Sequence, residues 1–386
     1  MISAVSDRPA AGVCHALGEN AALPPLRLYI TVATPGGKVP AGVKHQSKHL
    51  PALTGLRFVL ALWVILHHLT GRGQMLEAAA LAMPAPVYAL LRGGYLAVTT
   101  FFVLSGFVLS RSYSGTEWSP RNLLRYGAGR IARVYPVYLL SLAVVAPFIL
   151  SDATPAKTPL LAAHGLLLQG WLGHLPVNWN TPAWSLSCEI FFYVSFPVAA
   201  VVVLRAGWAR TLAVAAAACG LTRVLWACGV PDDIKPIIHL SDFLMGVAAA
   251  RAYQLMGGKR SGAWLYAPAI ALSAALIAWP AWLPAGVDLN TALRPLNGIL
   301  LIGLALGGGA TARALSSRLA VYLGKASYAM YILHVPMLWW YLRWTRAGSP
   351  SVYLSAVIGL SALVYRYVEE PANRWLRSRV HAALEA

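Results

Sequence analysis

The sequence predicts an all-α integral membrane protein. Of its 386 residues, 58% are hydrophobic and 11% are charged, and the mean hydropathy is +0.60. A soluble domain carries about 25% charged residues, so this composition excludes a water-soluble globule. Apolar stretches also recur along the chain at the length of about 20 residues that a helix needs to cross a bilayer.

Ten stretches are apolar and long enough to cross, and we therefore predict a bundle of ten transmembrane helices. They lie at residues 54–70, 93–112, 133–150, 183–204, 208–228, 236–254, 263–284, 291–309, 320–342 and 349–367. An eleventh stretch, 158–175, is shorter and is interrupted by polar residues. We expect this eleventh stretch to be re-entrant or interfacial.

The positive charges indicate the orientation in the membrane. The loop 111–133 holds five arginines against one glutamate, which is typical of a cytoplasmic loop. Arg205 and Arg210 should lie on the same side, which requires that 158–175 enters and leaves on the outer side. Both termini are then cytoplasmic, and we expect the protein to lie in a cell inner or plasma membrane. The net charge of +18 reflects cytoplasmic and membrane-surface positions of Lys and Arg, and we predict no nucleic-acid partner.

Composition divides the chain into three parts. Residues 1–50 contain many Pro and Gly residues and no long apolar run, so we expect a mostly irregular cytoplasmic arm. Residues 51–376 form the transmembrane domain, and 377–386 form a basic cytoplasmic tail.

The four cysteines show neither a CxxC motif nor Cys/His metal spacing, so we predict no disulfide and no metal.

Arg57 and His68 are the most informative pair of residues. Both lie in one apolar stretch and are 11 positions apart, which is about 1100° of helix rotation, or three turns plus about 20°. Their side chains therefore share one helix face, roughly 16 Å apart along the axis. Ionisable groups are costly in hydrocarbon and usually have a function there. We predict that this face lines a cleft, with a permanent cation at one depth and a general base at another.

Glu189 lies about two turns into another predicted crossing, at a depth comparable to that of His68 under the expected topology. A carboxylate beside an imidazole fixes its tautomer and raises its basicity. We therefore predict that His68 is a general base tuned by Glu189. The alternative is a structural role, in which the carboxylate bonds nearby polar groups (Trp184, Ser185 and Tyr193) or pairs with an arginine.

Two further groups of polar residues precede or enter predicted crossings. Arg130 and Arg133 are three residues apart and share a helix face. They could hold the phosphates of a donor that arrives from the cytoplasm, or serve as ordinary positive anchors. Ser327, Tyr331 and His334 have i, i+4, i+7 spacing and form a polar stripe that faces the bundle interior. This stripe lines a substrate site or forms a hydrogen-bonded seam.

Two other features favour structural roles. Ser105 and Gly106 are small residues among bulky ones, which permits close approach of helices in a membrane. Asp242 is an acid within a predicted crossing, and its expected partner is a buried arginine such as Arg223 or Arg251.

Taken together, these motifs resemble the membrane-bound acyltransferase-3 family. The residues that carry the resemblance are Leu53–Arg57 with His68, Phe101–Gly106, Arg130 and Arg133 with Tyr135 and Pro136, Trp184–Glu189, Leu323–Tyr328 with His334, and Glu370 and Pro371 with Arg374. They extend over about 50–376, in order along the chain. The sequence departs from the family at 188–190, where Cys-Glu-Ile replaces the Val-Glu-Glu of many members.

The resemblance implies ten transmembrane helices and the transfer of an acyl group, usually acetyl from acetyl-CoA, to a hydroxyl. It also implies that Arg57 and His68 are essential and that Arg130 and Arg133 lie near the donor. Many members carry a fused soluble hydrolase-like domain, and we expect none here. Members of this stand-alone type include enzymes that acylate exopolysaccharide or sugar residues and enzymes that acylate macrolides.

We therefore predict a membrane-bound O-acyltransferase with acyl-CoA, most simply acetyl-CoA, as co-substrate. Its acceptor is a hydroxyl of a sugar, a polysaccharide or a macrolide-type metabolite, and His68 and Glu189 are its catalytic residues. The predicted substrate-binding residues are Arg57, Arg130, Arg133, Trp184, Ser185, Ser327, Tyr331 and His334. The alternative is a transporter or flippase of a glycan or lipid precursor, which would use buried charges as a path and would release no CoA.

Overall fold

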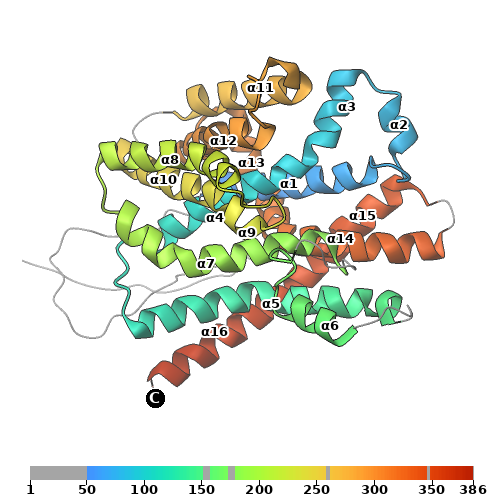
Figure 1. Cartoon of the computed structure of the whole chain (residues 1–386). Helices are drawn as coiled ribbons and strands as arrows, with labels where there is room; N and C mark the ends of the chain where they lie inside the picture. Colours follow the sequence, from blue (N-terminus) through green and yellow to red (C-terminus); the bar gives the residue numbers. More distant parts are fainter. Residues whose placement is uncertain (1–49, 151–156, 173–178, 258–260, 346–347, 386) are drawn as a thin grey trace, which may run out of the picture. The chain divides into compact units, whose positions relative to one another are not determined.

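The computed structural model describes residues 50–150, 157–172, 179–257, 261–345 and 348–385. Within these ranges every regular element is helical (Figure 1), which confirms the predicted all-α class. The arm predicted at residues 1–50 lies, except for Leu50, outside the described residues.

The helices follow one another along the chain. In order they are α1 (Pro51–Leu69), α2 (Glu77–Leu81), α3 (Ala85–Arg92), α4 (Leu96–Ser112), α5 (Pro120–Leu150), α6 (Lys157–Gly165), α7 (Trp184–Val203), α8 (Trp208–Ala227), α9 (Lys235–Ile238), α10 (Leu240–Met256), α11 (Ala263–Ala278), α12 (Leu289–Leu306), α13 (Gly309–Leu315), α14 (Arg318–Trp344), α15 (Pro350–Val364) and α16 (Glu370–Glu385). Four short turns of other helical types are η1 (Gly93–Tyr95), η2 (Thr181–Ala183), η3 (Pro280–Trp282) and η4 (Tyr365–Glu369).

Ten of these helices overlap the ten predicted crossings: α1, α4, α5, α7, α8, α10, α11, α12, α14 and α15. Six helical segments in the described ranges are long and apolar enough to cross a bilayer, namely Pro51–Leu69, Ala85–Ser112, Pro120–Ile149, Thr181–Val203, Leu289–Leu306 and Pro350–Leu384. α11 is apolar but only 16 residues long, and α8, α10 and α14 carry charged side chains. The chain is thus a multi-pass membrane protein, and the number of ten crossings stays a prediction.

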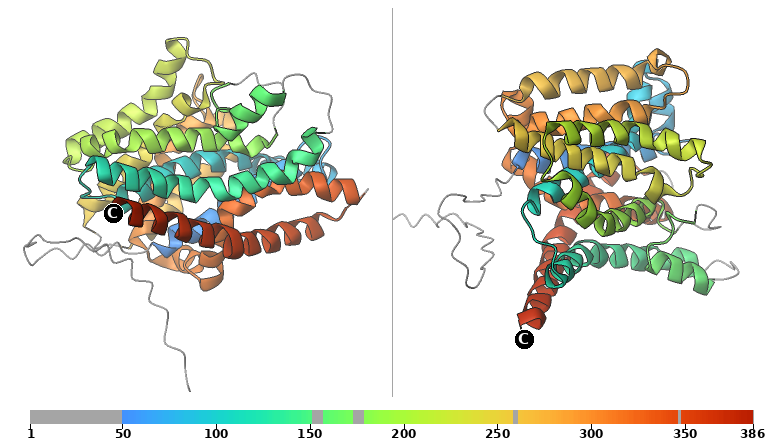
Figure 2. Two further views of the ribbon diagram at one scale, coloured as in Figure 1. Left: turned by 90° about the horizontal axis from the view of Figure 1, so that it is seen from below. Right: turned by 60° about the vertical axis from the view of Figure 1, so that its left-hand side comes forward.

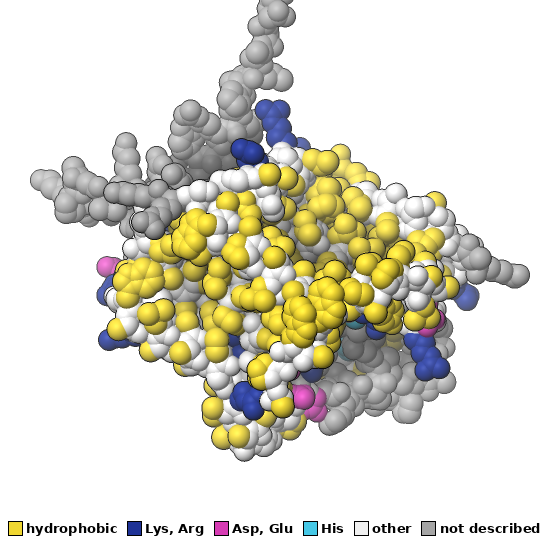
Figure 3. Space-filling view, turned by 90° about the horizontal axis from the view of Figure 1, so that it is seen from above, with side chains coloured by type: hydrophobic (Ala, Val, Ile, Leu, Met, Phe, Trp, Pro, Cys, Tyr) yellow, Lys and Arg dark blue, Asp and Glu magenta, His cyan; other side chains and the backbone are white. Residues whose placement is uncertain are grey.

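The outer surface of the helices is strongly apolar. Trp264, Ile270 and Leu272 of α11 are exposed, and α11 is the uppermost helix in Figure 1. Figure 3 views the molecule from that side and shows hydrophobic side chains over most of the face, with Lys and Arg near its margins. Such a large apolar surface is typical of contact with lipid.

In the described part of the segment 158–175, which ends at residue 172, the helix is the nine-residue α6, which is too short to cross a bilayer. Its residues Leu160, His164 and Leu167 are buried, and the hydroxyl of Tyr138 on α5 donates to the carbonyl of His164 over 2.6 Å. The described part of this segment therefore packs against α5, and its re-entrant or interfacial placement stays a prediction.

Residues 377–385 of the expected C-terminal tail are part of a longer helix, and residue 386 lies outside the described residues. α16 runs without a break from Glu370 to Glu385, and Figure 2 shows it lying beside α5. The boundary predicted at residue 376 therefore falls inside a helix that packs on the transmembrane bundle.

Helices α4 and α10 pack in close contact. A Cβ atom at Gly106 would collide with the carbonyl oxygen of Phe243, and one at Gly246 would collide with the carbonyl oxygen of Val103. The two glycines therefore let the backbones touch, which confirms the packing role predicted for Gly106.

Replacing Gly246 with leucine is expected to destabilise the protein by about 3 kcal/mol, because the added atoms have no space between the two backbones. Thermal unfolding in detergent measures this effect. Gly359→Leu is the matched control, since a Cβ built at Gly359 meets nothing within 4 Å apart from its chain neighbours and its own helix backbone. Equal melting temperatures for the two variants would contradict the close contact between α4 and α10.

Candidate active site

Two adjoining cavities lie between α1, α4, α7 and α14. The first, which we call the arginine cavity, has a volume of about 130 Å³ and is lined by Arg57, Arg130 and Arg133. The second, which we call the histidine cavity, has a volume of about 280 Å³ and is lined by His67, His68 and His239. Val98 and Tyr331 line both cavities, so these two side chains form a shared wall.

The packing of α1 on α14 brings the predicted residues of these two helices together. A Cβ atom at Gly324 of α14 would collide with the carbonyl oxygen of Thr54 on α1, so the helices are in backbone contact near Arg57. Arg57 therefore lines the arginine cavity together with Ser327 and Tyr331 of α14. One helical face of α1 thus supplies Arg57 to one cavity and His68 to the other.

Aromatic rings hold Arg130 in the arginine cavity. Its guanidinium lies 5.6 Å from the ring centre of Tyr193, 5.7 Å from that of Tyr113 and 6.0 Å from that of Tyr126. These cation–π contacts stabilise a buried cation and leave its polar edge for an anion.

Arg133 has an acidic partner that the sequence did not reveal. Its guanidinium forms an ion pair with Glu369, which is 1% exposed, and lies 5.2 Å from the ring centre of Tyr328. Glu369 belongs to the π-helical turn η4, an irregularity that is frequent at functional sites. The adjacent Glu370 belongs to a motif that supports the family resemblance, and that was the only signal near this position.

Glu189 belongs to the arginine cavity, and the prediction that it pairs with His68 is wrong. Its carboxylate accepts a hydrogen bond from the hydroxyl of Tyr193, one turn further along α7. No hydrogen bond joins Glu189 and His68, both of which are described residues. The carboxylate instead offsets part of the positive charge of Arg57 and its neighbours, which is the structural alternative considered above.

The tautomer of His68 is set by other partners. Its Nδ1 lies 2.9 Å from the carbonyl oxygen of Val64 and 3.4 Å from Nε2 of His334. A carbonyl oxygen only accepts, so Nδ1 of His68 carries the proton and Nε2 is its basic atom. Nδ1 of His334 likewise lies 2.6 Å from the carbonyl oxygen of Tyr331, which leaves its Nε2 as an acceptor for His68. The histidine cavity therefore holds an imidazole in the form that a general base requires.

The remaining predicted residues line the cavities, and three of them also form side-chain hydrogen bonds. The hydroxyl of Tyr331 donates to Oγ of Ser185 over 2.9 Å, and Ser327 donates to the carbonyl of Gly324 over 2.8 Å. Trp184 lines the histidine cavity. The polar stripe on α14 is therefore a seam and a lining at the same time. The structure brings to the two cavities, or into contact with a lining residue, all ten predicted residues: Arg57, His68, Arg130, Arg133, Trp184, Ser185, Glu189, Ser327, Tyr331 and His334.

Asp242 has a different partner from the two that the sequence suggested. It pairs with Arg294 of α12 over 2.5 Å, whereas Arg223 contacts the carbonyl of Gly286 and Arg251 donates to a carbonyl on the chain after α7. Asp242 is also 2.8 Å from Nδ1 of His239. Arg294 is a lone charge in an apolar stretch, so the criterion that singled out Arg57 applies to it as well.

Comparisons with known proteins point to one family. The acyltransferase-3 family model, described as an acyltransferase domain, matches residues 50–366. The chain is 28% identical to acyltransferase MdmB of Streptomyces mycarofaciens, over 86% of this chain and 93% of that protein. It is 26% identical to O-acetyltransferase OatA of Staphylococcus aureus strain NCTC 8325, over 40% of this chain and 25% of that protein.

A putative O-acetyltransferase of Staphylococcus aureus strain COL is also 26% identical, over 41% of this chain and 26% of that protein. The match to the two staphylococcal proteins thus covers about a quarter of each. No solved structure matches the chain. The family model covers most of the sequence, and the chain therefore belongs to the acyltransferase-3 family and is an acyltransferase.

Proposed function

We propose that this protein transfers an acyl group, most simply acetyl, from acyl-CoA to a hydroxyl of a sugar, a polysaccharide or a macrolide-type metabolite. The junction of the two cavities supports this proposal most strongly. A group of three arginines lies on one side of the wall formed by Val98 and Tyr331, and the basic imidazole of His68 lies on the other. The relatives named O-acetyltransferase favour acetyl as the group and oxygen as its acceptor.

The arginine cavity suits the charged head of the donor. Guanidinium groups bind phosphate with paired hydrogen bonds, and CoA carries several phosphates. Arg130 and Arg133 lie at the end of the arginine-rich segment 111–133 that we expect to face the cytoplasm, where acyl-CoA is found. The pantetheine arm then extends past Val98 and Tyr331 and brings the thioester to the histidine cavity.

The chemistry needs one base and no covalent intermediate. Nε2 of His68 takes the proton from the acceptor hydroxyl as its oxygen attacks the thioester carbonyl carbon. The new C–O bond forms, the C–S bond breaks, and the departing CoA thiolate receives the proton from His68. Products are the acyl ester and free CoA. The thioester of the donor and the hydroxyl of the acceptor then meet in the histidine cavity, which supplies the proximity that such a transfer requires.

Replacing Arg57 with alanine is expected to raise the KM for acetyl-CoA about 10- to 100-fold, which is the contribution of a hydrogen bond to a charged group. Steady-state kinetics in membranes measure the change. Arg379→Ala, at an exposed arginine of α16, is the matched control. An unchanged KM for acetyl-CoA in Arg57→Ala would contradict a role for this residue in donor binding.

A thiol assay tests the proposed function itself. Membranes that contain the protein are given acetyl-CoA with methyl glycosides, dextran or a macrolide antibiotic, and the release of free CoA is followed. We expect release that depends on His68 and increases with the correct acceptor. The proposal is overturned if CoA release does not depend on His68. A transporter or flippase would move the acceptor across the membrane and release no CoA.

A further inference from the structure

We infer that the acceptor enters through a third cavity on the far side of His239 and that His239 positions its hydroxyl group beside His68. This inference rests on the proposed function, because it assigns the acceptor side of the same reaction. It adds a binding site for a glycosyl group. It also adds a positioning residue, His239, that is not among the motifs on which the family resemblance rests.

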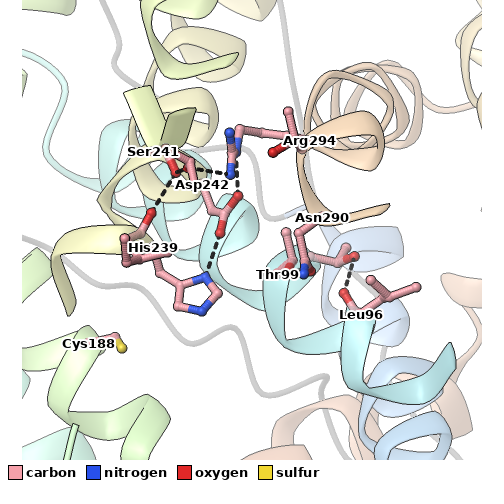
Figure 4. Close-up of polar contacts among 12 residues, drawn as sticks. Leu96, Thr99, Cys188, His239, Ser241, Asp242, Asn290 and Arg294 are labelled. Atoms are coloured by element: carbon pink, nitrogen blue, oxygen red, sulfur yellow. Dashed lines mark hydrogen bonds and ion pairs between the residues drawn. The ribbon is translucent and has the colours of Figure 1, made fainter. Parts of the chain in front are cut away.

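His239 is held by a buried charge network (Figure 4). The carboxylate of Asp242 lies between Nε of Arg294, at 2.5 Å, and Nδ1 of His239, at 2.8 Å. Asp242 is 0% exposed and Arg294 is 2% exposed. Arg294 also donates to Oγ1 of Thr222 and to the carbonyl of Ala218 on α8. The network therefore ties α8, α10 and α12 to one imidazole.

The network also determines which atom of His239 faces a ligand. An ionised carboxylate only accepts hydrogen bonds, so Nδ1 of His239 carries a proton. In the neutral imidazole, Nε2 is then the acceptor. Within the described ranges, no residue bonds this atom. The ring is fixed against Phe102 and Trp184, at centroid distances of 5.0 and 5.4 Å, and therefore presents Nε2 in one orientation.

His239 separates two cavities of similar size. The third cavity, which we call the entry cavity, has a volume of about 300 Å³. It shares Lys235, His239 and Asn290 with the histidine cavity. Asp232, in the turn before α9, and Asp288, at the N-cap of α12, line its other end. A molecule that enters between these turns therefore reaches His68 only after it passes His239.

The lining of these two cavities suits a polyhydroxylated ring. Trp184 and Trp226 supply apolar indole faces, one in each cavity. Asn290 accepts a hydrogen bond from the hydroxyl of Thr99 over 2.7 Å, which directs its NH₂ group away from Thr99 as a donor. A glycosyl group has the apolar faces and the alternating hydroxyls that match this combination, whereas a simple alkyl alcohol would leave the polar groups unpaired.

The two imidazoles have different tasks because of their different neighbours. His68 lies beside the wall shared with the arginine cavity, where the thioester arrives. His239 lies beside the entry cavity, where the acceptor arrives. Its Nε2 accepts a hydrogen bond from one hydroxyl of the acceptor, which places a neighbouring hydroxyl near Nε2 of His68.

The variant His239→Asn tests this assignment. The Asn amide replaces Nδ1 as a donor to Asp242 and removes the group at the position of Nε2. We expect the KM for the best methyl glycoside to rise about tenfold, the contribution of one hydrogen bond to a neutral group, with an unchanged KM for acetyl-CoA. His381→Asn, at an exposed histidine of α16, is the matched control.

Several results would overturn the inference. These are an unchanged KM for the glycoside, an equal rise in both KM values, or a fall in kcat alone. If acetyl-CoA is cleaved in a His68-dependent reaction that no glycoside stimulates, the glycosyl site is wrong and the proposed function is limited to another acceptor. If wild-type membranes release no CoA in a His68-dependent reaction, the proposed function itself fails.

A second measurement does not depend on the fold of His239→Asn. A cysteine replaces Asn290 in a background with Cys14→Ser and Cys228→Ser, and a water-soluble maleimide is added. We expect the new cysteine to react and the best methyl glycoside to slow the reaction several-fold. A cysteine that does not react, or whose reaction the glycoside does not slow, would show that no acceptor path passes this point.

Discussion

Replacing His68 with alanine is expected to lower kcat for acyl transfer by about 10²- to 10⁴-fold, the usual contribution of a general base. The reason is geometric. The carbonyl of Val64 and Nε2 of His334 hold the Nδ1 proton of His68, which leaves Nε2 as the basic atom toward a cavity that adjoins the arginines. Thiol release from acetyl-CoA with a saturating acceptor measures the loss.

The control for this variant is His381→Ala, at an exposed position of α16, with protein amount and thermal stability measured in parallel. The KM for acetyl-CoA should stay near that of the wild type, because His68 does not line the arginine cavity. Activity of His68→Ala within tenfold of the wild type would show that another group accepts the proton.

Replacing Arg294 with methionine is expected to destabilise the protein by about 3–5 kcal/mol, because it leaves Asp242 as an uncompensated buried charge. Arg294 also bonds Thr222 and the carbonyl of Ala218, so its loss removes several contacts between α8 and α12. Thermal unfolding in detergent measures the effect. Arg251→Met is the matched control, since Arg251 is only partly buried and contacts a backbone carbonyl and the side chain of Gln254.

The double variant Asp242→Leu/Arg294→Met separates the buried charge from general damage. Removal of both charges is often neutral or stabilising, so we expect the double variant to regain most of the stability lost in Arg294→Met. An additive loss in the double variant would show that the two residues stabilise the fold through separate contacts and not as a pair.

Helical periodicity was enough to predict the face of α1. Arg57 and His68 share it because their spacing is close to a whole number of turns, and nothing in the fold alters that rotation. The same reasoning found the stripe of Ser327, Tyr331 and His334 on α14. In both cases the relevant distance lies within one helix, so the sequence contains the geometry.

Contacts between helices were harder to predict from the sequence. The predicted depth of Glu189 was estimated along the membrane normal, and this gives no information about its direction around α7. Glu189 consequently faces the arginines, and His334 takes the place beside His68 that was predicted for Glu189. Asp242 and Arg294 lie on different helices, and several arginines were equally plausible partners before α10 and α12 were positioned.

The network of His239 could not be predicted for a second reason. His239 precedes α10 and follows the short helix α9, where no periodic pattern defines a direction. Its role follows only from the buried Asp242 beside it and from the cavities on both sides of its ring. The number of crossings is limited in a similar way, because charged residues within α8, α10 and α14 reduce the hydropathy on which such predictions depend.

The central claim is that one donor molecule extends from the arginine cavity to His68. Its most direct test is a structure of the protein with a non-cleavable thioether analogue of acetyl-CoA. We predict that CoA phosphates contact Arg57, Arg130 or Arg133. We also predict that the carbonyl carbon of the analogue lies about 3–3.5 Å from the oxygen of an acceptor hydroxyl that is hydrogen-bonded to Nε2 of His68. Phosphates bound elsewhere, or an acyl group that ends outside the histidine cavity, would contradict the account.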